Sequence, residues 1–89
     1  MADLSDLGKV LTVGAMLLDE DCSAEYLGCN VGVSVASLKR YLGELRHLGC
    51  EIVSRREPNG WFYRLENADA VRVRLLRWLE LEQSRTLLG

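Results

Sequence analysis

The sequence has little proline, histidine or cysteine. Its 89 residues include one proline, one histidine and three cysteines. Because the cysteine count is odd and Cys22, Cys29 and Cys50 form no C-x-x-C pair, we expect reduced thiols rather than a disulfide framework. The single histidine, His47, has no metal-ligand partner at helical spacing. We therefore predict no metal site and no cofactor.

Long hydrophobic runs are also missing, since none approaches the roughly 20 residues of a membrane-spanning helix. The acidic start, Met1 to Asp6, lacks the basic and then apolar order of a secretory signal. We find neither a glycine-rich phosphate loop nor a Ser/His/Asp grouping that could be placed as a catalytic site. These absences predict a cytoplasmic protein that has no membrane association and is not an enzyme.

Charge is nearly balanced overall but unevenly distributed along the chain. The sequence has 11 basic and 13 acidic residues, a net charge of −2. Residues 1–25 hold one base and six acids, residues 34–64 hold six bases and three acids, and residues 65–89 hold four of each. The total argues weakly against nucleic-acid binding, but a local basic segment matters more for DNA than the sum. Residues 34–64 are therefore the candidate DNA-binding segment.

Hydrophobic periodicity predicts four helices within a single domain, since a core of this size rarely divides. Ser23 and Ser34 are expected to cap the second and third helices, because a serine oxygen can accept a free N–H group there. Gly28, inside the second helix, is expected to weaken it. The third helix carries leucines at spacings of four, three and three, and Gly49 follows as its stop. The expected helices cover residues 4–18, 24–30, 34–48 and 70–87.

After the third helix the hydrophobic period changes to two. Residues 51–56 and the aromatic-rich residues 61–65 each predict a strand. Between them, residues 57–60 contain proline and an Asn-Gly pair, which is typical of a hairpin turn. The fold class is therefore mainly α with one β-hairpin, an α+β arrangement.

In this order, the elements resemble the winged helix-turn-helix domain of DNA-binding regulators, of the DeoR type and the biotin-operon-repressor type. Residues 33–42, 45–52 and 55–65 carry the resemblance, which covers about residues 5–66. Its motif combines a serine cap, a leucine stripe, a glycine stop and a basic hairpin in register. The resemblance implies a three-helix core with a two-stranded wing, and residues 1–66 as the DNA-binding domain. No sensing domain follows residue 66, so we predict no small-molecule effector.

The resemblance implies that helix 34–48 enters the major groove and that wing 52–65 contacts the backbone or minor groove. The leucine stripe faces inward, so the opposite side of the first two helical turns faces DNA. Serine and basic side chains there can bond bases or phosphates, and small apolar ones can contact thymine methyl groups. The predicted DNA-binding residues are Ser34, Val35, Ala36, Ser37, Lys39, Arg40, Arg55, Arg56, Asn59 and Arg64.

Several residues near this predicted site have a plain structural alternative. The basic side chains could form an ordinary solvated surface. Gly43 would let a DNA backbone approach closely, or it is simply tolerated on a surface helix. Trp61, Phe62 and Tyr63 are expected to pack on the helices, and His47 is expected at the surface.

The last helix carries more apolar surface than one side of a small domain needs. We therefore predict that residues 67–89 form a dimerisation element and that a two-fold homodimer binds an inverted repeat in double-stranded DNA. The alternative is that the helix folds back on its own core. The predicted interface residues are Val71, Leu75, Trp78 and Leu79.

The predicted function is a sequence-specific transcriptional regulator, a repressor rather than an activator. A winged helix can also serve protein–protein contact. The alternative is therefore an interaction module or accessory factor without direct DNA binding.

Overall fold

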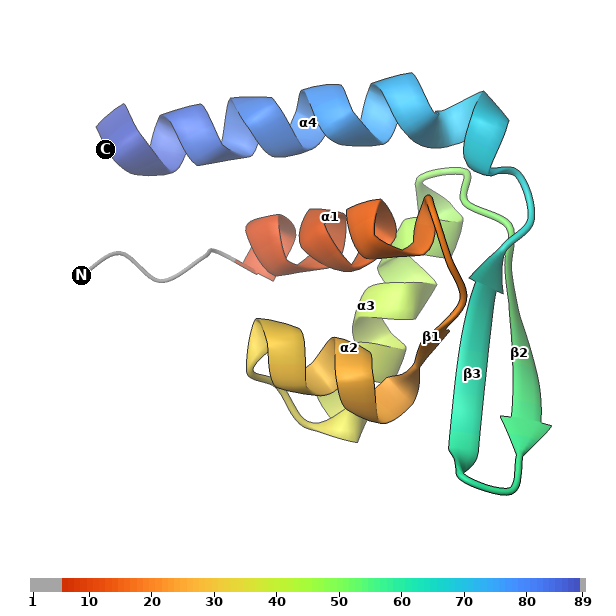
Figure 1. The fold of residues 1–89 in the computed structure, drawn as a ribbon. Coiled ribbons are helices and arrows are strands. Elements are labelled where there is room, and N and C mark those ends of the chain that lie inside the picture. The colour runs from red at the N-terminus through yellow and green to blue at the C-terminus, as the bar shows by residue number, and fades with distance from the viewer. Residues whose placement is uncertain (1–5, 89) are drawn as a thin grey trace.

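The computed structural model describes residues 6–88, and the side chains of residues 6–85. It is an α+β fold, and the described residues form four helices and one antiparallel sheet (Figure 1). The helices and the hairpin lie where the sequence predicts them, with ends shifted by one or two residues, although the expected start of the first helix at residue 4 lies outside the described residues. In chain order, the elements are α1 (Asp6–Leu17), β1 (Cys22–Ser23), α2 (Ala24–Val31), α3 (Val35–His47), β2 (Ile52–Glu57), β3 (Gly60–Leu65) and α4 (Ala68–Leu88).

The sheet contains a strand that the sequence pattern does not predict. In β1, Cys22 pairs with Tyr63 and Ser23 with Phe62, which gives the strand order β1-β3-β2. The expectation of a two-stranded hairpin alone is therefore wrong. A strand of two residues is too short to show a period of two, so its pairing with β3 is visible only in the folded chain.

Both predicted serine caps are confirmed. The hydroxyl oxygen of Ser23 accepts the backbone N–H of Tyr26 at 3.0 Å, and that of Ser34 accepts the backbone N–H of Ser37 at 3.2 Å. Beyond the far end of α3, Gly49 has a φ of 104°, a conformation that favours glycine. The caps fix both ends of α3, and the burial of its leucines fixes which of its residues face outward.

The turn between α2 and α3 depends on two glycines. Gly32 ends α2 with a φ of 69°, in the left-handed region. A Cβ at Gly28 would lie 3.0 Å from the carbonyl oxygen of Val33, and the Val33 N–H donates to the Gly28 carbonyl at 3.0 Å. Gly28 therefore lets the turn close against α2, a role that the sequence interpretation of a weakened helix missed.

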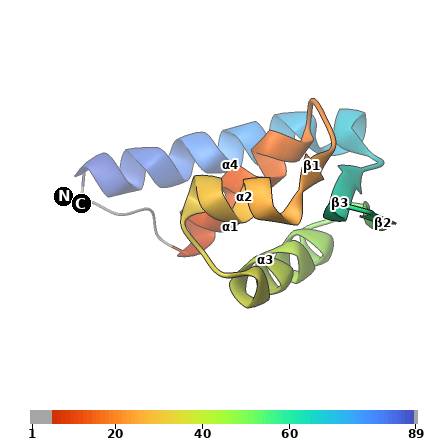
Figure 2. The ribbon, with the colours of Figure 1, turned by 60° about the horizontal axis from the view of Figure 1, so that its bottom comes forward.

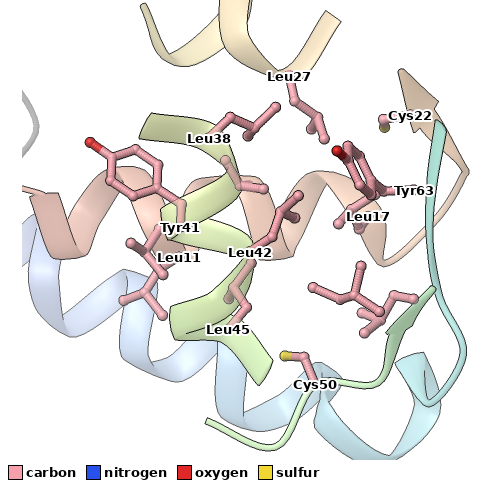
Figure 3. Close-up of a cluster of buried hydrophobic side chains, with 14 of the residues drawn as sticks. Leu11, Leu17, Cys22, Leu27, Leu38, Tyr41, Leu42, Leu45, Cys50 and Tyr63 are labelled. Carbon is pink, nitrogen blue, oxygen red and sulfur yellow. The ribbon is translucent and has the colours of Figure 1, made fainter. Parts of the chain in front are cut away.

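The core lies where α1, α3, α4 and the sheet meet (Figure 3). Leucines of α3 are directed into this core, and the α2 residue Leu27 enters it from the other side. A Cβ at Gly14 of α1 would lie 2.9 Å from Cδ2 of Leu45, so its absence allows α1 and α3 to approach. The side chains that are at most 1% exposed include Leu11, Val13, Leu27, Leu38, Leu42, Leu45 and Leu75.

α4 runs along α1 and completes the core of its own chain (Figures 1 and 2). Val71 is 2% and Leu75 is 0% exposed, and Trp78 and Leu79 pack partly buried against the core. The prediction that Val71 and Leu75 contact a second subunit is therefore wrong, because both are already buried in the core of their own chain. Although α4 has 21 residues, none of the helices in residues 6–88 is long and apolar enough to cross a membrane.

Candidate nucleic-acid interface

α3 presents one exposed stripe on the side opposite its buried leucines. At 3.6 residues per turn, Ala36, Lys39, Arg40, Gly43 and His47 lie along this stripe. All are exposed except Gly43, which is half-buried. The stripe carries two permanent positive charges and no acid. α3 lies on a different side of α1 from α4 (Figure 2).

Gly43 has no role in the packing of the described chain. A Cβ at this position would meet no described atom within 4 Å, and its backbone is not among those with a positive φ. Glycine inside a helix costs about 1 kcal/mol relative to alanine. Gly14 and Gly28 avoid close contacts, whereas Gly43 leaves a bare patch of backbone in the middle of the exposed stripe.

A hollow of about 260 Å³ separates α3 from the hairpin of β2 and β3. Its lining includes Lys39, Arg46, Ser54 and Trp61. The guanidinium group of Arg46 donates to the carbonyl oxygen of Ile52, from Nε at 3.2 Å and from Nη2 at 3.0 Å. These bonds tie α3 to β2 and hold a positive charge beside the hollow.

Trp61 stands at the hairpin end of this hollow. It is 41% exposed, so the expectation that it packs in the core is wrong, whereas Tyr63 is 5% exposed and belongs to the core as expected. Arg56 pairs with Trp61 across the strands, and its Cζ lies 5.8 Å from the centroid of the indole ring. Side chains of directly paired residues share one face of a sheet. Arg56 and Trp61 therefore lie on the face turned toward α3.

A second hollow, of about 490 Å³, lies between α2, the start of α3 and the hairpin turn. Trp61 borders this hollow too, together with Ser34, Val35 and Asn59. The hydroxyl groups of Ser34 and Ser37 lie 3.3 Å apart, so Ser37 is engaged in the cap of α3. The two hollows and the stripe on α3 adjoin one another.

Arg55 and Arg64 lie on the opposite face of the hairpin. Strand side chains alternate between faces, so Arg55 points away from the side that Arg56 occupies. Nη1 of Arg55 lies 3.3 Å from Oδ2 of Asp21, and Nε of Arg64 lies 3.9 Å from Oδ1 of the same carboxylate. The structure therefore places the three predicted hairpin arginines on two faces, Arg56 on one and Arg55 and Arg64 on the other. The hydrogen bonds that the Arg55 guanidinium donates to Glu57 and then to Asp21 also raise its pKa.

We call the side that carries the stripe, both hollows and Arg56 the α3–hairpin surface. It combines Lys39, Arg40, Arg46 and Arg56 with one acid, Glu25 of α2, which lines the second hollow. Sequence reasoning missed Arg46, Ser54 and Trp61 as members, although Arg46 follows Lys39 by seven residues, or two helical turns. Its members are Glu25, Ser34, Val35, Ala36, Lys39, Arg40, Gly43, Arg46, His47, Ser54, Arg56, Asn59 and Trp61.

Within residues 6–88, no three His, Cys, Asp or Glu side chains come together as a metal site would require. Comparisons with protein-family models, curated proteins and solved structures found no match to this chain. What the α3–hairpin surface does is therefore inferred from its geometry and charge.

Proposed function

We propose that this chain is a winged helix-turn-helix protein that binds double-stranded DNA in a sequence-specific way and regulates transcription. The order of helix, helix, tight turn, helix and hairpin supports the fold assignment. The observation that carries the function is the α3–hairpin surface, where four positive charges adjoin a bare helical glycine and a single acid, Glu25, lies at the edge formed by α2. We propose repression rather than activation, because occupying a DNA site is enough to repress.

In the proposed complex, α3 enters the major groove with its first turns toward the bases. Ala36 contacts a thymine methyl group, and Lys39 and Arg40 reach guanine or phosphate oxygens. Gly43 lets the sugar-phosphate backbone approach the helix. Arg56 and Trp61 meet the backbone or the minor groove from the hairpin side.

Fluorescence anisotropy with a labelled duplex of random sequence tests this proposal. The logarithm of the binding constant should fall linearly with the logarithm of salt concentration, and Lys39→Ala and Arg56→Ala should each reduce that slope by about 0.9. Arg85→Ala is the matched control, since it removes an equal charge from α4 at a side chain that is 77% exposed and lies outside the α3–hairpin surface. The proposal fails if the wild-type protein shows no salt-dependent binding, or if the control lowers the slope as much.

A second candidate function is protein–protein contact through the α3–hairpin surface. The exposed indole of Trp61 and the apolar side chains of Val33 and Val35 border the larger hollow, and aromatic side chains are enriched at protein interfaces. This function would leave random DNA unbound at low salt, so the same titration separates the two candidates.

We further propose a homodimer that pairs through the outer side of α4. Exposed apolar side chains there, Val73, Leu76 and Leu81, border a shallow hollow together with Arg77 and Glu80. Neither Arg77 nor Glu80 has an ion pair within the described part of the chain. Antiparallel pairing about a two-fold axis brings Arg77 opposite the partner's Glu80, and the reverse. Such a dimer leaves the α3–hairpin surface free.

A further inference from the structure

Three consecutive acids, Asp19 to Asp21, connect α1 to β1. Asp21 directly precedes β1, and the pairing of β1 with β3 holds its carboxylate beside the hairpin. Both oxygens of Asp21 are used there. Oδ2 lies 3.3 Å from Nη1 of Arg55, and Oδ1 lies 3.9 Å from Nε of Arg64. One carboxylate therefore engages both arginines on the outer face of the hairpin.

Two further acids complete this group. Oε1 of Glu57 lies 2.8 Å from Nε of Arg55, and Oε2 of Glu66 lies 3.7 Å from Nε of Arg64. We call these five side chains the outer cluster; its three acids and two bases give a net charge of −1. The α3–hairpin surface, on the other side of the hairpin, carries four positive charges and one acid, Glu25, a net charge of +3. The two sides of one hairpin thus differ sharply in their attraction for phosphate.

Stability alone does not explain this placement of Asp21. The side chains of Arg55 and Arg64 are 49% and 60% exposed, and ion pairs at such exposed positions contribute little to the free energy of unfolding. Their charge nevertheless acts on any polyanion that approaches, because attraction to phosphates is the sequence-independent part of DNA binding.

We propose that Asp21 is a specificity-determining residue, which keeps Arg55 and Arg64 from acting as a second, sequence-independent surface for DNA. The inference rests on the proposed DNA-binding function and deepens it. With Asp21 in place, only the α3–hairpin surface attracts the phosphates of DNA, and there α3 can also contact base edges. Without it, Arg55 keeps only Glu57 and Arg64 keeps only Glu66 as an acidic partner. The net charge of the outer cluster then rises from −1 to 0, which makes both arginines more available to phosphates. Specificity is the ratio of specific to non-specific affinity, so suppressing the second surface raises it.

Asp21→Asn tests the proposal, since it removes the charge while keeping the size of the side chain. Glu20→Gln is the matched control, because Glu20 is exposed, adjacent, and without an ion pair in the described residues. For a random duplex, the slope of log affinity against log salt should steepen by up to about 1.8 in Asp21→Asn, or 0.9 for each released arginine. The control should change it far less, and circular dichroism checks that both variants keep the fold.

The double substitution Arg55→Ala/Arg64→Ala, made in the wild-type protein and in Asp21→Asn, tests whether these two arginines cause the steeper salt dependence. In the wild-type background the double substitution should leave the slope unchanged, and in the Asp21→Asn background it should remove the gain. If Asp21→Asn behaves like Glu20→Gln, or if the double substitution already lowers the wild-type slope by about 1.8, the inference is overturned while DNA binding itself stands. Absence of salt-dependent binding in every variant overturns both proposals. Binding gained only by Asp21→Asn overturns the proposed function, and the inference with it, because the wild-type protein then has no specific binding for Asp21 to protect.

Discussion

At the residue scale, the fold requires a glycine at position 14, whereas the packing of the described residues does not require one at position 43. A Cβ at Gly14 would lie 2.9 Å from Cδ2 of Leu45 in the core, whereas a Cβ at Gly43 would meet no described atom within 4 Å. The same residue type therefore serves close helix packing at one position and leaves bare backbone at the other. Replacement by alanine is therefore expected to destabilise the protein at Gly14 and to stabilise it at Gly43.

Gly43→Ala should raise the free energy of unfolding by about 0.5–1 kcal/mol, because alanine is the better helix former. It should also weaken DNA binding, since the added methyl group stands where the backbone of DNA approaches in the proposed complex. Urea unfolding and fluorescence anisotropy measure the two effects. Gly14→Ala is the contrasting variant and should destabilise the protein by about 1–3 kcal/mol through overpacking. A more stable Gly43→Ala protein with unchanged affinity would remove this helix from the interface.

The three cysteines should differ in reactivity. Cys29 is exposed, whereas Cys22 and Cys50 are buried. Burial raises the pKa of both the Cys22 and the Cys50 thiol, so at pH 8 they hold less of the reactive thiolate than an unperturbed thiol does. A thiol reagent should modify one equivalent rapidly and two slowly, and Cys29→Ser should abolish the rapid phase. Two rapid equivalents in the native protein would contradict this prediction.

At the scale of elements, the alternation of strand side chains distributes the hairpin charges. Arg56 shares a face with Trp61 and turns toward α3, and Arg55 shares the other face with Phe62. The alternation itself follows from the strand period, but which face meets α3 depends on how the sheet packs. The hairpin thereby contributes one arginine to the α3–hairpin surface and pairs two others with acids.

Trp61 should report directly on whether the hairpin meets DNA. In a Trp78→Phe background it is the remaining tryptophan, and its fluorescence should change when duplex DNA is added at low salt and recover at high salt. Trp61→Ala should weaken binding with little loss of stability, because the indole is 41% exposed. Tyr63→Ala, at a buried position on the same strand, should instead cost about 3–5 kcal/mol of stability, as large-to-small aromatic substitutions in cores do. An unchanged Trp61 signal at saturating DNA would place the hairpin away from the duplex.

At the scale of the whole molecule, α4 has an inner side that completes the core and an outer side available to a partner. The hairpin turn points away from α4, and α3 lies across α1 from it (Figures 1 and 2). A dimer through the outer side of α4 would therefore carry two separate α3–hairpin surfaces. A two-fold arrangement of this kind should bind an inverted repeat, with half-site centres about one or two helical turns apart.

Charge reversal on α4 tests this dimer. Arg77→Glu and Glu80→Arg should each weaken self-association, because each sets like charges opposite one another across the two-fold axis. An equimolar mixture of the two variants should associate again, since opposite charges then face each other at both contacts. Sedimentation equilibrium at micromolar concentration gives the masses. A wild-type mass of one chain, 10.0 kDa, would rule the dimer out.

The sequence by itself determined the local elements of this protein. Leucine spacing and the serine caps predicted α3, and the change of period with an Asn-Gly turn predicted the hairpin. Each of these patterns is complete within a few neighbouring residues, because helix and strand periods and capping hydrogen bonds are local. The basic segment, residues 34–64, could also be found from the sequence, because its charges lie close together along the chain.

The tertiary structure alone decided which of these surfaces meet. The pairing of β1 with β3 and the contact of Asp21 with Arg55 join residues far apart in the chain, and no periodic sequence pattern predicts these contacts. The burial of Val71 and Leu75 within their own chain was likewise not predictable from the sequence. An apolar stripe indicates that it is covered, but not whether its own chain or a second subunit covers it. The physical reason is that burial and charge pairing depend on surfaces brought together by the whole fold, whereas periodicity depends only on the backbone geometry of a single element.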